Sequence, residues 1–233
     1  MQKASQLISK TIHGYELEAL LYENGVTALF VAYKEDTWVV IKVGIAKEAG
    51  VLMHREAKIL ASLKHLNIVV LIDQFELNGM PALVLERHAR GSLLSHLGAF
   101  SGAQIEQHFL SLIDAISYMH KKNITHRDIK PENILLASDG RLVLIDFGLA
   151  YFRGEPTYSS LGTPHYSAPE ILHGAPPNVW SDLYALTLVM YQLFCESRPP
   201  HLLVAECLHD MLKGSKRADI EVPPHFSPRT RSL

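Results

Sequence analysis

Four polar side chains in the middle of the chain have types and spacing that suit the transfer of a phosphoryl group. They are Asp128, Lys130, Asn133 and Asp146. Phosphoryl transfer leaves a protein little covalent chemistry to do, because the main tasks are to position the reactants and to neutralise charge. Mg²⁺ prefers hard oxygen ligands, which Asn133 and Asp146 could supply. Asp128 could accept the proton of an incoming hydroxyl group, and Lys130 could steady a transferring phosphate.

A lysine and a glutamate in the first part of the chain form a second candidate pair. Lys42 stands near the end of the β-branched run 37–43, which predicts a strand, and Glu56 stands in 47–64, where apolar residues recur at helical intervals. Opposite charges about 4 Å apart attract by about 4 kcal/mol at an effective dielectric constant of about 20, before desolvation is subtracted. Such a pair would bias the position of the helix, with Glu48 as the alternative partner of Lys42.

The elements that must position these groups follow from apolar periodicity. The runs 68–72 and 82–85 flank the polar turn 77–80 and predict a hairpin. The polar stretch 152–164 predicts a long loop, and 180–195, which is apolar on all sides, predicts a helix at the centre of a larger lobe. A single apolar stripe predicts a further, amphipathic helix through Ile105, Phe109, Leu112, Ile113, Ile116 and Met119.

A second predicted hairpin carries two of the candidate side chains at its ends. Its strands are 133–136 and 141–145, joined by the turn signal Ser138-Asp-Gly140. Asn133 stands at the start of the first strand and Asp146 directly after the second. The hairpin therefore places the two expected metal ligands at adjacent strand ends.

Four segments in this order resemble the eukaryotic-type (Hanks-type) serine/threonine protein kinase family, which is also found in bacteria. They are Val39-Val-Ile-Lys42 with Glu56, Thr125-His-Arg-Asp-Ile-Lys-Pro-Glu-Asn133, Ile145-Asp-Phe-Gly148 and Gly162-Thr-Pro-His-Tyr-Ser-Ala-Pro-Glu170. One of these motifs alone would mean little, but all of them in the right order and structural context are a specific signal. The resemblance covers about residues 14–210, most of the chain.

The resemblance implies an α+β, bilobal protein-kinase-like fold, made by a single kinase domain over residues 1–233. A small β-rich N-lobe is expected at about 14–86, a hinge at 87–91 and a larger, mainly helical C-lobe at 92–233. The C-lobe is expected to be short, because the family normally continues past this point with further helices.

The resemblance also implies a role for each polar side chain of the second half. In the family, the residue at the position of Asp128 is the catalytic base, and the one at Lys130 contacts the transferred phosphate. The residues at Asn133 and Asp146 are metal ligands. ATP and Mg²⁺, with Mn²⁺ as an alternative ion, are the implied cofactors.

The nucleotide site is expected to draw on both halves of the chain. The family lysine at Lys42 contacts the α- and β-phosphates, and the glutamate at Glu56 steadies it. Backbone groups from Glu86 to His88 are expected to hydrogen-bond the purine edge, and Leu135 to form an apolar wall. Further candidates for apolar walls are Phe30 or Val31 and Ile145, with Leu85 behind the pocket.

The nucleotide-covering loop departs from the family pattern G-x-G-x-x-G. The aligned stretch is Glu23-Asn-Gly-Val-Thr-Ala28, in which Gly25 keeps its glycine and Ala28 is a small replacement. Glycine lets the backbone approach phosphates without a clash at Cβ, whereas Glu23 adds a negative charge near a polyanion. Gly25 and Ala28 are expected to lie at the nucleotide. The departure supports the alternative that the chain is a pseudokinase, a binding or scaffold module.

The hydroxyl group that accepts phosphate is expected to belong to Ser or Thr of a protein substrate. Lys130 after Asp128 is typical of serine/threonine kinases, in which the residue at Thr163 can bridge the two. The loop that precedes Thr163 contains Thr157, Ser159 and Ser160. A phosphate there would add a charge of about −1.5 to −2 that suits Arg127. We expect autophosphorylation, with self-association for transfer between copies, and an unmodified flexible loop is the alternative.

Two further acidic residues have expected structural roles. Asp182 matches the buried aspartate that anchors the backbone of the catalytic loop in the family. Glu170 matches a glutamate that pairs with an arginine near the end of the domain, but neither Arg229 nor Arg231 occupies that position.

Composition excludes several other classes of protein. The chain has 233 residues, of which 48% are hydrophobic and 20% charged, and a formal net charge of −2. It can therefore bury a core, and it has no electrostatic case for binding nucleic acid. Two cysteines allow no disulfide framework, and the 13 histidines form no H-E-x-x-H motif. No signal peptide is evident and no apolar run approaches the roughly 20 residues of a membrane span, so a cytoplasmic protein is expected.

A small-molecule phosphotransferase is the third interpretation. Such enzymes share an Asp-x-x-x-x-Asn loop and a later aspartate with this chain. The segment from Gly162 to Glu170 disfavours them, because they lack a peptide-docking segment of this kind.

Overall fold

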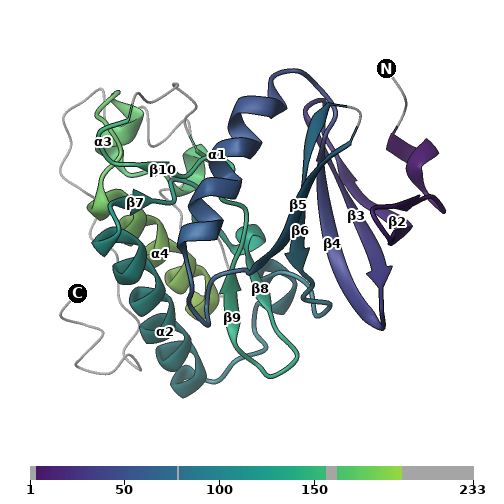
Figure 1. The fold of residues 1–233 in the computed structure, drawn as a ribbon. Helices are drawn as coiled ribbons and strands as arrows, with labels where there is room; N and C mark the ends of the chain where they lie inside the picture. Colours follow the sequence, from purple (N-terminus) through teal and green to yellow (C-terminus); the bar gives the residue numbers. More distant parts are fainter. Residues whose placement is uncertain (1–3, 78, 156–161, 196–233) are drawn as a thin grey trace. The chain divides into compact units, whose positions relative to one another are not determined.

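The structure, a computed structural model, describes residues 4–77, 79–155 and 162–195. Contacts divide the chain into two compact units, Met1–Lys64 with Ile68–Ala89, and His65–Asn67 with Arg90–Leu233. The loop residues Thr157, Ser159 and Ser160, and all residues after Cys195, lie outside the described residues. Figure 1 labels the helices and most of the strands of both units.

The first unit is a single antiparallel sheet with one helix. The sheet has the strand order β1-β2-β3-β4-β6-β5. Its strands are β1 (Thr11–Ile12), β2 (Tyr15–Glu23), β3 (Thr27–Lys34), β4 (Thr37–Gly44), β5 (Leu71–Leu77) and β6 (Met80–Glu86). A 3-10 turn, η1 (Ala4–Leu7), precedes the sheet, and the helix α1 (Ala49–Ser62) packs against β4, β5 and β6.

Tight turns with left-handed backbone join the first strands. His13 and Gly14, with φ of 51° and 83°, connect β1 to β2, and Glu35 and Asp36, with φ of 48° and 61°, connect β3 to β4. Two-residue hairpin loops with positive φ at both positions are type I′ turns, whose twist matches that of the flanking strands. The segment from Ala4 to Ile12, for which the sequence predicted no element, thus extends the sheet by one short strand.

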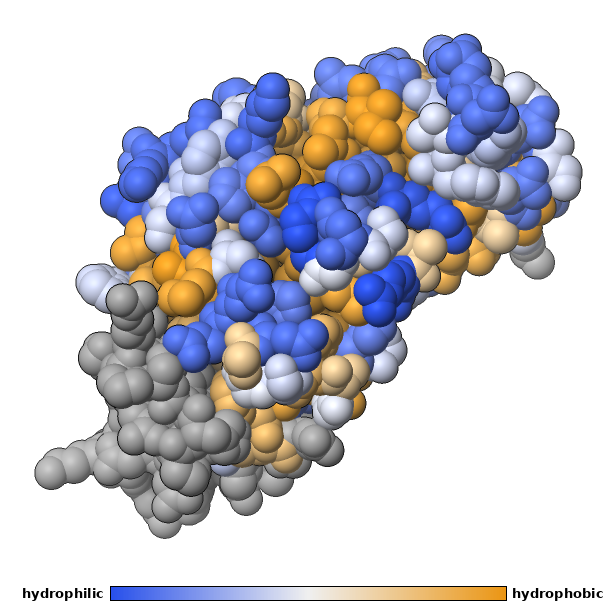
Figure 2. Space-filling model, turned by 90° about the horizontal axis from the view of Figure 1, so that it is seen from below, coloured by the Kyte–Doolittle hydropathy of each residue, from blue (hydrophilic) through white to orange (hydrophobic). Residues whose placement is uncertain are grey.

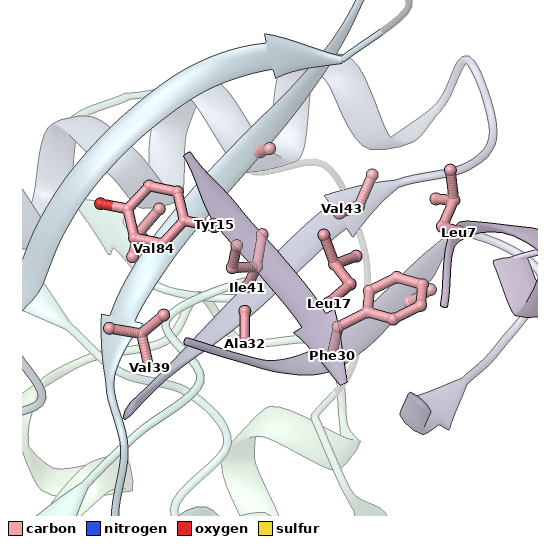
Figure 3. Packing of buried hydrophobic residues seen from close by; sticks show 11 residues of the cluster. Leu7, Tyr15, Leu17, Phe30, Ala32, Val39, Ile41, Val43 and Val84 are labelled. Carbon is pink, nitrogen blue, oxygen red and sulfur yellow. The ribbon is translucent and has the colours of Figure 1, made fainter. Parts of the chain in front are cut away.

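Residues alternate between two faces of this sheet. One face carries the hydrophobic cluster of Figure 3, in which Leu7 and Leu17 pack with Phe30 and Ile41. Neighbouring residues of a strand point to opposite faces, so Lys42 lies on the other face. The residues directly opposite one another across β3, β4 and β6 share that face, namely Leu29, Val31, Val40, Leu83 and Leu85.

The second unit contains the larger helices. They are α2 (Gly102–Lys121) and α4 (Val179–Cys195), which pack against each other, and the short α3 (Pro169–Leu172). The strands are β7 (Ile124–Thr125), paired with β10 (Tyr151–Phe152), and β8 (Ile134–Leu136), paired with β9 (Leu142–Leu144). Three 3-10 turns complete the described part, η2 (Leu93–His96), η3 (Pro131–Asn133) and η4 (Pro164–Tyr166).

The helix α2 begins with a reciprocal cap. The backbone N–H of Gln104 donates to the Ser101 hydroxyl, and the Gln104 side chain accepts from the Ser101 backbone N–H. This capping box satisfies two donors that a helix start leaves open. The predicted stripe is buried at Ile105, Phe109, Leu112, Ile116 and Met119, which confirms the amphipathic helix.

Two of the predicted elements differ in detail from the structure. The first hairpin is present, but its leading strand is β5 at Leu71–Leu77 and not the run 68–72, which was therefore misplaced. Ile68 and Val69 are buried but do not belong to that strand. Their apolar side chains therefore indicate burial and not strand pairing. The helix α4 is not buried all round, because the Trp180 residue is 70% exposed.

Exposed apolar side chains occur in both units. The face in Figure 2 carries apolar groups among polar ones. The large exposed residues are Leu21, Tyr22, Trp38, Val51, Leu66, Val70, Ile72, Leu110 and Trp180. None of the helices in the described ranges has both the length and the apolar character that a membrane span requires.

Thr125 in β7 generates a stability prediction. It is 1% exposed, and its hydroxyl oxygen has no hydrogen-bond partner among the residues that the structure describes. A buried hydroxyl without a partner loses its hydrogen bonds to water on folding. We therefore expect Thr125→Val, which replaces the hydroxyl with a methyl group of similar shape, to raise the free energy of unfolding by about 1 kcal/mol.

Urea denaturation of the two proteins measures this difference. Thr125→Ala is the control, because it leaves a cavity and should lower the free energy of unfolding. A Thr125→Val protein that is less stable than the parent would contradict the prediction.

Candidate active site

Lys42 of β4 and Glu56 of α1 form a buried ion pair. The Lys42 ammonium donates to both carboxylate oxygens of Glu56, at 2.8 and 3.0 Å, and the two side chains are 10% and 1% exposed. Glu48, the alternative partner, is exposed at the start of α1. Removing one member of a buried pair leaves the other charge unpaired, at a cost of about 3–5 kcal/mol. The pair therefore fixes α1 against the face of the sheet that carries Lys42.

The turn between β2 and β3 holds Gly25, while Ala28 lies within β3. A Cβ added at Gly25 would meet no atom within 4 Å, and its φ is not left-handed, so neither space nor backbone conformation requires glycine there. Ala28 is fully buried in the hydrophobic cluster, on the sheet face opposite Lys42. Phe30 lies in the same cluster, so of the two candidate walls only Val31 shares the Lys42 face.

The residues expected at the purine edge follow the end of β6. The Glu86 backbone N–H donates to the Val70 carbonyl at 3.0 Å, and Glu86 is paired with Val39 in the sheet. The His88 Nε2 lies 3.6 Å from the Glu86 carboxylate, and the His88 side chain is only 4% exposed. Arg87 lies over the ring of Trp38, with 5.6 Å between its guanidinium carbon and the ring centroid.

In the second unit, the Asp128 carboxylate is held by donors on both oxygens. Oδ1 accepts from the Thr163 hydroxyl at 2.8 Å and from the Thr163 backbone N–H at 2.9 Å. Oδ2 lies 2.7 Å from the Lys130 ammonium and accepts from the Asn133 amide at 2.9 Å. The Lys130 ammonium also donates to the Thr163 hydroxyl at 2.7 Å, so the expected bridge between Asp128 and Lys130 is confirmed.

These donors determine the protonation of Asp128. Burial alone would raise its pKa, but hydrogen bonds from Lys130 and Thr163, together with the charge of Lys130, outweigh burial and lower the pKa below its ordinary value. The carboxylate therefore stays ionised at neutral pH. Gly162 allows this arrangement, because a Cβ at that position would collide with the Arg127 carbonyl oxygen.

The hairpin of β8 and β9 places Asn133 and Asp146 at its ends, as predicted. Ile134 pairs with Leu144, and the Ile145 N–H donates to the Asn133 carbonyl at 2.9 Å, so the two residues flank the same end of the hairpin. Asp146 is exposed and has a left-handed backbone with φ of 57°. Leu135, in the middle of β8, forms an isolated bridge with Ser92.

Asn133 is oriented by Asp128. Its amide nitrogen donates to the Asp128 backbone carbonyl and to the Asp128 carboxylate, both at 2.9 Å. Because both of these groups only accept hydrogen bonds, the amide oxygen must point the other way. An amide oxygen and the exposed Asp146 carboxylate are the hard oxygen donors that Mg²⁺ prefers, so the donor set fits this ion.

Asp182 anchors the backbone of the loop that carries Asp128, as predicted. Its carboxylate accepts from the backbone N–H groups of His126 and Arg127 and from the His120 ring, each at 2.9 Å, and it is 1% exposed. Arg127 has φ of 72°, a conformation that is costly for a residue other than glycine. The hydrogen bonds that the Arg127 and His126 backbone N–H groups donate to Asp182 hold Arg127 in this conformation.

Some features of the site had no signal in the motifs. The Arg127 guanidinium lies over the Tyr151 ring, at 5.3 Å from the centroid, and the Tyr151 hydroxyl donates to the Pro177 carbonyl at 2.7 Å.

The part of the chain that the structure describes offers no cationic partner for Glu170. Arg229 and Arg231 lie outside it.

Comparison with known proteins assigns the family. The family model described as "Protein kinase domain" matches residues 23–233. The chain is 37% identical to serine/threonine-protein kinase Nek1 of Mus musculus, with 77% of this chain and 15% of that protein covered. It is 34% identical to the Aurora kinase of Schizosaccharomyces pombe, with 78% and 52% covered. It is 33% identical to CBL-interacting serine/threonine-protein kinase 5 of Arabidopsis thaliana, with 84% and 45% covered.

The chain therefore belongs to the protein kinase domain family, and the predicted kinase fold is confirmed. Within that family its similarity is to the eukaryotic-type serine/threonine kinases. It spans at most about half of the length of these relatives.

The Asp182 anchor generates a prediction for stability. Asp182→Asn keeps the size of the side chain, but its amide group offers one acceptor oxygen in place of two. One of the backbone N–H groups of His126 and Arg127 would then face an amide nitrogen and lose its partner. We expect the free energy of unfolding at pH 7 to fall by about 2–3 kcal/mol, measured by urea denaturation.

Asp114→Asn is the matched control, because the Asp114 side chain is 79% exposed. That variant should change the free energy of unfolding by less than about 0.5 kcal/mol. Equal stability of the Asp182→Asn and Asp114→Asn proteins would contradict the anchoring role.

The lowered pKa of Asp128 generates a prediction for pH dependence. A carboxyl group whose pKa is lower in the folded than in the unfolded state stabilises the fold fully above its unfolded pKa, which is about 4. This stabilisation is lost as the pH falls through the folded pKa. We therefore expect Asp128→Asn to be less stable than the parent at pH 7, and the difference to shrink as the pH falls below about 4. Urea denaturation over that pH range tests this, and a difference that stays constant or grows towards low pH would refute it.

Proposed function

We propose that the chain is an ATP-dependent protein kinase that transfers the γ-phosphate of Mg-ATP to Ser or Thr hydroxyl groups of protein substrates, and that residues 1–233 form a single kinase domain. The observation that carries the proposal is the Asp128 carboxylate, held between Lys130 and Thr163 and next to Asn133. The family match over residues 23–233 supports a functional origin for this arrangement.

The residues of the second unit divide the work of the transfer. Asp128 orients the incoming hydroxyl group and accepts its proton. Lys130 neutralises negative charge that develops on the transferred group. Thr163 holds the Asp128 and Lys130 side chains in position through its hydroxyl group. Mg²⁺ supplies positive charge at the phosphates when it is bound, and the Asn133 amide oxygen and the Asp146 carboxylate would hold it.

In the first unit, we assign phosphate and purine binding to the face of the sheet that carries Lys42. The Lys42 ammonium would contact the phosphates, with Glu56 fixing its position through the buried ion pair. Backbone groups from Glu86 to His88 would bind the purine edge. Gly25 and Ala28 would contribute through the backbone, since the Ala28 side chain is buried in the opposite face.

The substrate-dependent steps are part of the same proposal. Autophosphorylation would fall on Thr157, Ser159 or Ser160, and transfer between copies would need transient self-association. Arg127 is the proposed partner of such a phosphate, because it is the arginine of the catalytic loop.

A pseudokinase remains the second candidate, and the β2–β3 turn favours it. The turn keeps a single glycine of the family pattern, at Gly25, and Glu23 brings a negative side chain to it. Under this alternative the chain would bind a nucleotide or a partner protein with little turnover.

Transfer of radiolabel from [γ-³²P]ATP with Mg²⁺ separates the two candidates. We expect the parent protein to label itself or a basic protein substrate, and Asp128→Asn to lower the rate by about 10²–10⁴-fold, the range for loss of a general base. Lys42→Met should lower the rate and also weaken ATP binding. Mass spectrometry of the labelled protein would then locate the phosphate.

Asp114→Asn again provides the matched control, because it is the same chemical change at an exposed position, and it should keep the parent rate. Label in the Asp128→Asn protein equal to that of the parent would refute the assigned base. A parent protein that binds ATP but transfers no label would favour the pseudokinase.

A further inference from the structure

The turn that joins β2 to β3 is closed by a single side chain. The Asn24 Oδ1 accepts hydrogen bonds from the backbone N–H of Val26 at 2.9 Å and of Thr27 at 2.7 Å. The Thr27 hydroxyl lies 3.4 Å from the same oxygen, and the Asn24 backbone N–H donates to the Thr27 carbonyl at 3.0 Å. One amide oxygen therefore occupies two consecutive backbone donors of this turn.

The following strand holds the turn from its other side. The Ile45 backbone N–H donates to the Val26 carbonyl at 2.9 Å, and Thr27 pairs with Gly44 in the ladder of β3 and β4. The backbone on both sides of Val26 is thus committed to hydrogen bonds within the first unit. Gly25, which faces open space, contributes no left-handed residue to the turn.

Consecutive backbone N–H groups that converge on one point form a concave site for an anion oxygen. The neutral oxygen of Asn24 sits in that position in this turn. A phosphate oxygen that approached the Val26 and Thr27 N–H groups would have to displace it. Binding of phosphate by the backbone of this turn and closure of the turn by Asn24 are therefore alternatives.

We propose that Asn24 sets the affinity of this protein for the phosphate groups of a nucleotide, by holding the Val26 and Thr27 N–H groups in competition with them. The proposal rests on the proposed function, because it concerns the same nucleotide site. It makes the affinity for phosphates depend on a feature outside the Lys42–Glu56 pair and the Asp128 network. It also separates phosphate binding from purine binding, which does not involve the turn.

Removing the Asn24 amide should strengthen the binding of phosphates only. Asn24→Ala removes the competing oxygen without adding a glycine, and Asn24→Gly removes it and adds one. We expect each variant to bind Mg-ATP about tenfold more tightly than the parent. In the parent, phosphate binding must first break the hydrogen bonds to Asn24, and the net cost of one typical hydrogen bond corresponds to about this factor. The affinity for adenosine, which has no phosphate, should stay the same.

Isothermal titration calorimetry of the full chain with Mg-ATP and with adenosine makes this comparison. Asn178→Ala is the matched control, because the Asn178 Oδ1 accepts from the Trp180 N–H in a similar local bond at the start of α4, outside the turn. That variant should bind both ligands like the parent. Amide hydrogen exchange at Val26 and Thr27 provides a second readout, and Asn24→Ala should speed exchange at both.

The outcomes are distinct. Tighter binding of Mg-ATP with unchanged binding of adenosine supports the proposal. Binding of both ligands by all proteins, with Mg-ATP no tighter in either Asn24 variant, overturns the role of Asn24 and leaves the kinase assignment standing. Equal changes for Mg-ATP and adenosine overturn it too. If neither ligand binds to any of the proteins, the proposed nucleotide site fails, and the proposal for Asn24 falls with it.

Discussion

The buried carboxylate of Asp182 is the constraint on which the rest of the site depends. It is 1% exposed and takes its hydrogen bonds from the His126 and Arg127 backbone and from the His120 ring. A buried charge is tolerated only when such donors satisfy it, and a left-handed Arg127 is tolerated only when its surroundings hold it. The buried carboxylate and the left-handed Arg127 thus stabilise each other, and together they hold the loop that carries Asp128.

The position of the Asp128 carboxylate follows from that loop conformation. The Arg127 carbonyl lies where it permits only glycine at position 162, so the chain passes close enough for Thr163 to reach Asp128. The Thr163 and Lys130 donors then overcome the effect of burial on the Asp128 pKa. A carboxylate with a lowered pKa is a weak base, so under the proposed function Asp128 would contribute through positioning and charge more than through early proton transfer.

Much of this arrangement could be predicted from the sequence, because it follows from local patterns. The alternating apolar runs around Ser138-Asp-Gly140 were enough to predict the hairpin of β8 and β9, and the helical spacing was enough to predict α1 with Glu56 on it. The sequence could not show that Ile68 and Val69 are buried ahead of the strand β5, since an apolar run does not reveal which of its residues pair in a sheet. Nor could it show that Asn24 closes the β2–β3 turn, because an asparagine side chain can also point into solvent.

The polar networks of the second unit and the β2–β3 turn of the first unit differ in burial. Asp182 and Asp128 belong to networks in which replacement of one partner leaves a buried group unsatisfied, so the fold itself resists change at these positions. The turn from Glu23 to Thr27 is largely exposed, and a change there costs the fold little. Loss of the glycine pattern at the turn is therefore compatible with an intact Asp128 network. A chain of this kind can keep the Asp128 network intact while the turn changes independently, so the fold alone does not separate a kinase from a pseudokinase, and phosphoryl transfer itself is the property that does.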